Sequence, residues 1–251
     1  MKRLFLLIFI CCYHLSFTCL AQEMNEYALN ISKVNQPEAN LHFNCSFTLN
    51  FQDADSVSMN FGGDEMLSIE NLVVGGDSAL LKYDYHPSSQ RIIFHRVSSQ
   101  AVPITMEYNY TNLSAFFIYG EGHAEIWETS YNEYYYPYVP NTNIDLTINI
   151  EIPDSLSFIC AYPLESIGNG KYTSKLKGML SQSLSLALIQ KDAYIHTATN
   201  APYPLNIYQI SDMQCDEKRY DELLELAQAS ITYFCKIYGD EYLSTQRNIT
   251  A

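Results

Sequence analysis

The sequence predicts a mainly β fold, a large antiparallel β-saddle or sandwich with one C-terminal amphipathic helix. Three observations predict it. Apolar and polar residues alternate in several stretches, as in strands with one buried face. These stretches recur up to residue 210, separated by Gly and Pro turns and without a helical pattern between them. After residue 211 the apolar spacing changes to the period of a helix.

The first clear strand is Leu41–Leu49, in which every second residue is apolar and is predicted to face the core. Two glycine pairs followed by Asp, at 62–64 and 75–77, are predicted turns because Gly adopts a positive φ without steric cost. Shorter strands are predicted around these turns and beyond them, at Ser56–Phe61, Glu70–Val74, Arg91–Val97, Ile104–Tyr110, Ala115–Tyr119, Ser157–Ala161, Leu184–Gln190 and Leu205–Ile210.

The strongest strand signal is Ile144–Ile152, where five aliphatic residues alternate with Asp, Thr, Asn and Glu. This pattern predicts a half-buried antiparallel strand. Pro153 ends the strand, and the aromatic, proline-broken segment Tyr134–Pro140 is predicted to rim its other end.

A helix is predicted over Glu217–Tyr238, with Asp216 as its N-cap and Gly239 as the residue that ends it. Its apolar residues recur at spacings of three and four, which places them on one stripe of an amphipathic helix. The stripe consists of Tyr220, Leu223, Leu224, Ala227, Ile231, Phe234, Cys235 and Tyr238.

The first 21 residues are typical of a secretory signal peptide. Lys2 and Arg3 precede the apolar run Leu4–Ile10, which is too short to span a bilayer, and cleavage is expected after Ala21. Lipid anchoring through Cys19 is the alternative. We therefore expect an exported chain that is periplasmic, secreted or lipid-anchored at the cell surface, without a transmembrane span.

Without the signal peptide the chain would carry 12 basic and 28 acidic residues, a formal charge of −16. This charge argues against binding to nucleic acid or to anionic membranes. The acids are spread along the sequence, which is typical of a solvated surface.

Four of the seven cysteines lie outside the signal peptide, namely Cys45, Cys160, Cys215 and Cys235. The predicted helix separates the last two by roughly 30 Å, too far for a disulfide bond. Cys45 and Cys160 are predicted to lie on the inward faces of strands. Two alternatives remain for them there, namely buried free thiols and a Cys45–Cys160 disulfide bond.

An aromatic cluster is the main candidate for binding. If its rings are exposed on a sheet, they can stack on sugars or contact a protein partner, and they can equally line the seam with a neighbouring domain. The cluster consists of Trp127, Tyr131, Tyr134, Tyr135, Tyr136 and Tyr138.

The order of these elements resembles the M1 (gluzincin) aminopeptidase family. An N-terminal β-saddle domain in that family has a strand like Leu41–Leu49, an aromatic segment and long strand like Tyr134–Pro153, and a short aliphatic strand like Leu184–Ile189. A helix ending in Tyr/Phe-Gly, like Tyr233–Gly239, then leads into a thermolysin-like catalytic domain. The resemblance implies a signal peptide over 1–21, a β-saddle domain over 22–212 and the helical start of a missing catalytic domain over 213–251.

The sequence also departs from the family. Pro137-Tyr-Val-Pro140 stands where family members carry a Pro-Cys-x-Asp-Glu-Pro-like run. Neither HExxH nor Gly-x-Met-x-Asn occurs, and no two histidines stand four residues apart, so the chain lacks the zinc site of that family. We expect no cofactor and no catalytic residue in this chain, with zinc only in the missing catalytic domain.

The resemblance implies a non-catalytic domain of an exported M1-like zinc metallopeptidase, truncated or split. It would shape the substrate cleft and pack on the catalytic domain, and Glu125 or Glu128 would contact the substrate's free amino group. The alternative is a stand-alone secreted β-sandwich module that binds glycan, peptide or protein through the Tyr-rich face.

Overall fold

A computed structural model gives the fold of the chain. It describes residues 23–35, 40–62, 67–76, 81–97, 100–112, 127–128, 134–154, 156–160, 162–181, 184, 186–190, 194–199, 205–210, 217–238 and 249–250. The predicted signal peptide, the predicted strand Ala115–Tyr119 and the predicted helix caps Asp216 and Gly239 lie outside these residues.

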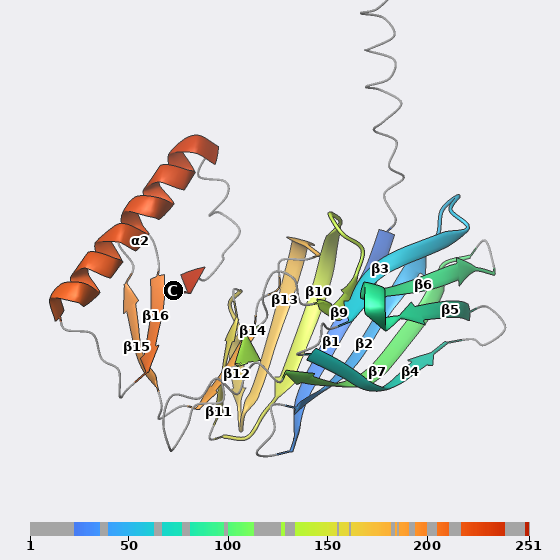
Figure 1. The fold of residues 1–251 in the computed structure, drawn as a ribbon, viewed down its shortest axis with the longest axis horizontal. Coiled ribbons are helices and arrows are strands. Elements are labelled where there is room, and N and C mark those ends of the chain that lie inside the picture. The colour runs from blue at the N-terminus through green and yellow to red at the C-terminus, as the bar shows by residue number, and fades with distance from the viewer. Residues whose placement is uncertain are drawn as a thin grey trace, which may run out of the picture.

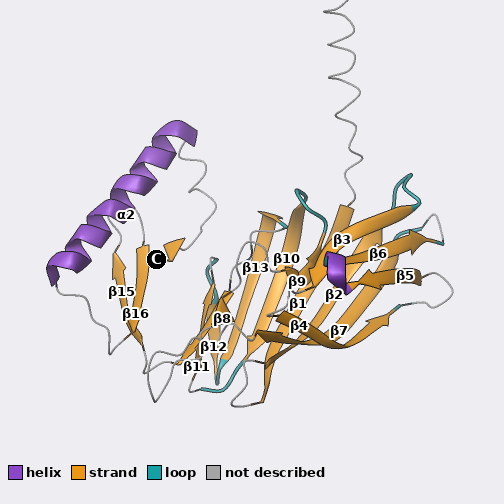
Figure 2. Ribbon diagram, viewed as in Figure 1, coloured by secondary structure: helices purple, strands orange, loops and turns teal. Residues whose placement is uncertain are grey.

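The described part of the chain is mainly β, as predicted, with one long helix near its C-terminal end (Figure 2). The elements are β1 Glu23–Asn35, β2 Asn40–Asn50, β3 Ser56–Gly62, β4 Leu67–Gly75, β5 Leu81–His86, a 3-10 turn Pro87–Ser89, β6 Arg91–Arg96, β7 Val102–Asn112, β8 Trp127–Glu128, β9 Tyr134–Tyr138, β10 Asn143–Glu151, β11 Leu156–Cys160, β12 Glu165–Gly168, β13 Lys171–Leu180, β14 Leu186–Gln190, β15 Tyr194–Thr199, β16 Leu205–Ile210, α2 Glu217–Tyr238 and β17 Ile249–Thr250.

A seven-stranded sheet in the order β12-β13-β10-β1-β2-β7-β4 forms the main layer (Figure 1). A four-stranded sheet, β5-β6-β3-β9, packs on one face of it. The rings of Phe47 and Phe94 lie 6.2 Å apart between the two layers, and those of Phe61 and Tyr108 lie 4.9 Å apart. Two smaller sheets, β11-β14-β8 and β15-β16-β17, complete the described fold.

The alternation predicted from the sequence is confirmed at the two strongest strands. The apolar residues of β2, from Leu41 to Leu49, are buried, and the polar residues between them are exposed or half-buried. The aliphatic residues of β10 from Ile144 to Ile150 are buried in the same way.

One detail of the predicted topology is wrong. The strand at Ile144–Ile152 was expected to be antiparallel throughout, but β10 is antiparallel only to β13 and runs parallel to β1. The large sheet is therefore mixed, because β1 lies between β10 and β2 in its middle. This pairing buries Leu29 and Ile31 beside Ile148 and Ile150.

The predicted helix is confirmed with the same limits, Glu217–Tyr238. Figure 1 shows α2 beside the small sheet of β15, β16 and β17, at the opposite end of the molecule from β5 and β6. Among the described residues, no helix combines the length and the apolar character needed to cross a membrane.

Candidate functional site

The Tyr-rich segment forms β9, the end strand of the four-stranded sheet. The side chains of Tyr135, Tyr136 and Tyr138 are 1%, 1% and 5% exposed, and Tyr134 is half-buried against the core. The expectation of an exposed aromatic face is therefore wrong for Tyr135, Tyr136 and Tyr138. Tyr135 packs 5.9 Å from Phe43 of β2 in the seven-stranded sheet, whereas the ring of Tyr136 lies 5.3 Å from that of Tyr138. Neighbouring residues of a strand point to opposite faces, and both faces of β9 are buried at these positions.

The buried hydroxyl groups hold this strand in place. Tyr27 donates a hydrogen bond of 2.8 Å to the carbonyl oxygen of Pro137, and Tyr108 donates one of 2.7 Å to that of Tyr135. Tyr135 in turn donates to the carbonyl oxygen of Leu184 at 2.8 Å. Proline has no N–H to offer a neighbouring strand, so it is tolerated at the end of the sheet. Each bond satisfies a backbone acceptor that burial removes from water.

Burial also keeps these groups neutral. It raises the pKa values of Tyr27, Tyr108 and Tyr136 well above their ordinary range, and it raises the pKa values of Cys45 and Cys160 to about 12. A thiol or phenol of this kind is a poor nucleophile and a poor base at neutral pH. Separately, the burial of Tyr135, Tyr136 and Tyr138 leaves no exposed ring at these three positions on which a glycan could stack.

Both cysteines on the inward faces of strands are free and buried, so the prediction of buried free thiols at Cys45 and Cys160 is confirmed and the alternative bridge between them does not form. Cys235 is also free and buried, whereas Cys215 lies outside the described residues.

The remaining predicted site residues are placed only in part. Glu125 and Tyr131 lie outside the described residues. Trp127 and Glu128 form β8, whose backbone pairs with Leu188 and Ala187 of β14, and their side chains are not among those described. The contact of Glu125 or Glu128 with a substrate amine stays a prediction.

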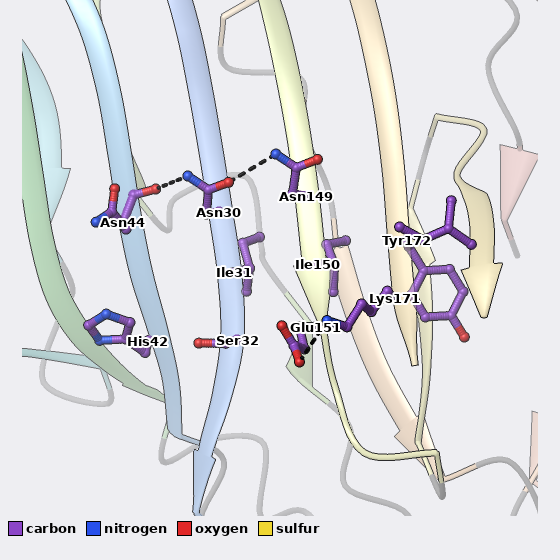
Figure 3. Close-up of a pocket in the computed structure, with 11 residues that line it drawn as sticks. Asn30, Ile31, Ser32, His42, Asn44, Asn149, Ile150, Glu151, Lys171 and Tyr172 are labelled. Carbon is purple, nitrogen blue, oxygen red and sulfur yellow. Dashed lines mark hydrogen bonds and ion pairs between the residues drawn. The ribbon is translucent and has the colours of Figure 1, made fainter. Parts of the chain in front are cut away.

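Two features that sequence reasoning missed are surfaces. The first is a hollow of about 280 Å³ on the outer, polar face of the seven-stranded sheet, between β1, β2, β10, β12 and β13. Figure 3 shows its side chains in two rows, one of asparagines and one that contains His42, Ser32, Glu151 and Lys171. The sequence signal was the series of Asn residues at outward positions of the strands.

The second surface is an apolar stripe on α2. Its side chains are Leu223, Leu226, Tyr233, Phe234 and Ile237, which are 55%, 64%, 62%, 51% and 52% exposed. At 3.6 residues per turn they cover about 100° of the helix surface. Leu223 and Phe234 belong to the predicted amphipathic stripe and are exposed, whereas Leu224, Ala227 and Ile231 of that stripe are half-buried and Cys235 is buried.

Neither surface brings together a metal site. Among the residues that the structure describes, no group of three or more His, Cys, Asp or Glu side chains could hold a metal ion. With no HExxH in the sequence, the residues present do not fit the zinc that the M1 resemblance implies.

Comparison with known proteins gives similarity at the level of fold. No model of a protein family matches the sequence, and no curated protein matches it. The structure is similar to an M1 zinc metallopeptidase from Deinococcus radiodurans, with a TM-score of 0.50, 11% identity, and coverage of 78% of this chain and 50% of that one. A two-domain M1 zinc metallopeptidase variant bound to L-tryptophan gives a TM-score of 0.50, 11% identity, and coverage of 78% and 49%. An M1 zinc metallopeptidase variant from Deinococcus radiodurans bound to a Tyr-Ser-Ala substrate gives a TM-score of 0.50 and 10% identity. This match covers 78% of this chain and 50% of that one.

These likenesses concern the path of the backbone, because the identity is too low to carry residue roles across. The chain spans about half the length of the metallopeptidase structures that it matches. It therefore shares the fold of one part of M1 zinc metallopeptidases.

Proposed function

We propose that this chain is the non-catalytic N-terminal β-saddle domain of an exported M1-like zinc metallopeptidase, in truncated or split form. In this role it shapes one wall of the substrate cleft and packs on a catalytic domain. The observation that carries the proposal is the structural likeness, which covers most of this chain but only half of each M1 zinc metallopeptidase. The element order seen in the sequence supports it independently.

The apolar stripe of α2 supports the packing part of this proposal. Monomeric proteins rarely leave a contiguous row of large apolar side chains in water, and such rows mark interaction surfaces. The stripe is rimmed by the exposed residue Glu222 on one side and by the half-buried face on the other. The occupant we propose is the catalytic domain, because the likeness to the M1 structures leaves half of their length unmatched.

The proposal gives this chain no catalytic role. A zinc peptidase of this class needs two imidazoles on one helical face and a carboxylate beside them. The HExxH motif that supplies them does not occur in this sequence, which supports the proposal. The Tyr-rich binding module is not proposed, because the rings of Tyr135, Tyr136 and Tyr138 are buried.

The test is peptidase activity of the purified full chain. It is supplied with zinc and incubated with a panel of aminoacyl-p-nitroanilides, with and without 1,10-phenanthroline. We expect nitroaniline release at the rate of the enzyme-free blank in both cases. Release above the blank that the chelator abolishes would contradict the proposal, because it would require a metal site within this chain.

A further inference from the structure

We propose that the hollow on the outer face of the seven-stranded sheet is a binding site for an uncharged, hydroxyl-rich ligand, a carbohydrate. The inference uses a surface formed by β1, β2, β10, β12 and β13 and does not depend on α2 or on the proposed peptidase role. The volume of about 280 Å³ lies just below the range of about 300–1,000 Å³ that is usual for small-molecule sites.

The first argument is a row of amides held in fixed orientation. Asn149, Asn30 and Asn44 are direct neighbours across β10, β1 and β2. The Nδ2 group of Asn149 donates to Oδ1 of Asn30 at 2.9 Å, and Nδ2 of Asn30 donates to the backbone oxygen of Asn44 at 3.3 Å (Figure 3). Thr173 lies at the other end, with its hydroxyl oxygen 3.0 Å from Oδ1 of Asn149. The chain of bonds pre-organises the row, which lowers the entropic cost of binding.

The row keeps hydrogen-bonding capacity that faces solvent. An amide has two donors and two acceptor lone pairs, and the bonds named above use only part of them. The side chain of Asn44 is exposed at the end of the row. Closely spaced groups that both donate and accept match the hydroxyl groups of a sugar, each of which also does both.

The second argument is electrical neutrality. Lys171 is paired with Glu151 at 3.2 Å, so the two charges in the hollow compensate each other. The ring of His42 lies 3.0 Å from the side-chain oxygen of Asn109 through Nδ1 and 3.4 Å from Glu107 through Nε2. The charges that line the hollow cancel and Glu107 adds a negative one beside it, so the hollow, on a chain with a formal charge of −14, does not favour an anionic ligand.

The third argument is an apolar wall. Ile167 of β12 lines the hollow and is 61% exposed. A sugar ring presents an apolar face and a polar rim. It can therefore place its face against Ile167 while its hydroxyl groups reach the amide row.

The spacing of the row argues against an extended peptide. Neighbouring strands are about 4.8 Å apart, so the amides repeat at that interval, whereas equivalent groups on one side of an extended peptide repeat at about 6.8 Å. A peptide laid across the strands would therefore match one amide and miss the next.

The test is titration of the isotope-labelled full chain with neutral oligosaccharides, followed through its backbone amide NMR signals. The probes are maltotetraose, cellotetraose and diacetylchitobiose, with tetragalacturonate as an anionic control and capped tetra-alanine as a peptide control. We expect at least one neutral oligosaccharide to shift signals from β1, β2, β10 and β13 in a saturable way. Asn44→Leu should weaken that binding about tenfold, the equivalent of one to two hydrogen bonds.

The matched control is Asn143→Leu, which alters an exposed asparagine of β10 outside the hollow and should change affinity less than about twofold. Three outcomes would overturn the proposal. In the first, none of the neutral oligosaccharides shifts these signals. In the second, Asn44→Leu binds as tightly as the unaltered chain. In the third, tetra-alanine or tetragalacturonate binds the hollow more tightly than every neutral sugar.

Discussion

Replacement of Tyr135 tests whether the Tyr-rich strand belongs to the core. The side chain is 1% exposed, its ring lies 4.7 Å from that of Tyr136, and its hydroxyl donates to the carbonyl oxygen of Leu184. Truncation of a buried aromatic ring to Ala costs about 3–5 kcal/mol. Tyr135→Phe keeps the ring and leaves a buried acceptor without this donor, which costs about 1–2 kcal/mol.

The measurement is urea-induced unfolding of the full chain, followed by far-ultraviolet circular dichroism at neutral pH. We expect the free energy of unfolding to fall by about 4 kcal/mol in Tyr135→Ala and by about 1–2 kcal/mol in Tyr135→Phe. Tyr83→Phe is the matched control, because Tyr83 is 41% exposed, and it should change stability by less than about 0.5 kcal/mol. If Tyr135→Ala unfolds completely, Tyr135→Phe still reports the hydrogen bond. A Tyr135→Phe chain as stable as the unaltered one would refute the reasoning.

Three further predictions concern a glycine, the reactivity of the buried thiols and the pH dependence of stability. Gly170→Ala should lower the free energy of unfolding by more than about 3 kcal/mol, because φ is +68° and a Cβ would lie 1.8 Å from the backbone oxygen of Ile152. Gly178→Ala is the control, since its φ is +60° but a Cβ there would have no atom within 4 Å. It should cost about 1 kcal/mol in the same unfolding assay. Equal costs for the two variants would contradict the clash. Cys45 and Cys160 should resist iodoacetamide at pH 8 in the folded chain and react in urea, as read by mass spectrometry of their peptides. Burial raises the pKa values of both thiols from the ordinary 9.0 to about 12, so between these pH values the folded chain binds more protons than the unfolded chain. The free energy of unfolding should therefore be largest below pH 9 and should decline as the pH rises from 9 toward 12. The decline should reach up to about 1.4 kcal/mol per pH unit for each thiol. Full labelling of the folded chain, or constant stability across that window, would contradict the burial.

Local pattern was enough to predict the strands whose alternation is unbroken. In β2 and β10 every second residue is buried, and the helical spacing gave the limits of α2. Strand β1 is not among the strands predicted from the sequence, because it contains a bulge between Asn25 and Ala28, with Glu26 at a φ of 55°. The bulge shifts the alternation, so Met24 and Tyr27 are both buried although they are three residues apart.

The position of a strand in a sheet depends on contacts between distant residues, which one sequence does not reveal. Asn30 and Asn149 are 119 residues apart, and only the parallel pairing of β1 with β10 brings them together. The burial of Tyr135 has the same origin, since tyrosine suits a core and an exposed face equally well. The segment Tyr134–Pro140 was predicted to rim the end of the strand Ile144–Ile152, but its first residues form β9, the end strand of the four-stranded sheet, where a proline is tolerated.

The central claim is that α2 presents its apolar stripe to a zinc-peptidase domain. The most direct measurement is photo-cross-linking in the cells that make the chain, with benzoylphenylalanine at Phe234 in the stripe and, as a control, at Thr232 on the exposed polar side of the helix. Mass spectrometry then identifies the adducts. We predict that the Phe234 position gives an adduct with a polypeptide that carries an HExxH sequence, and that the Thr232 position does not. Identical adducts at both positions, or adducts formed only with copies of this chain, would contradict the claim.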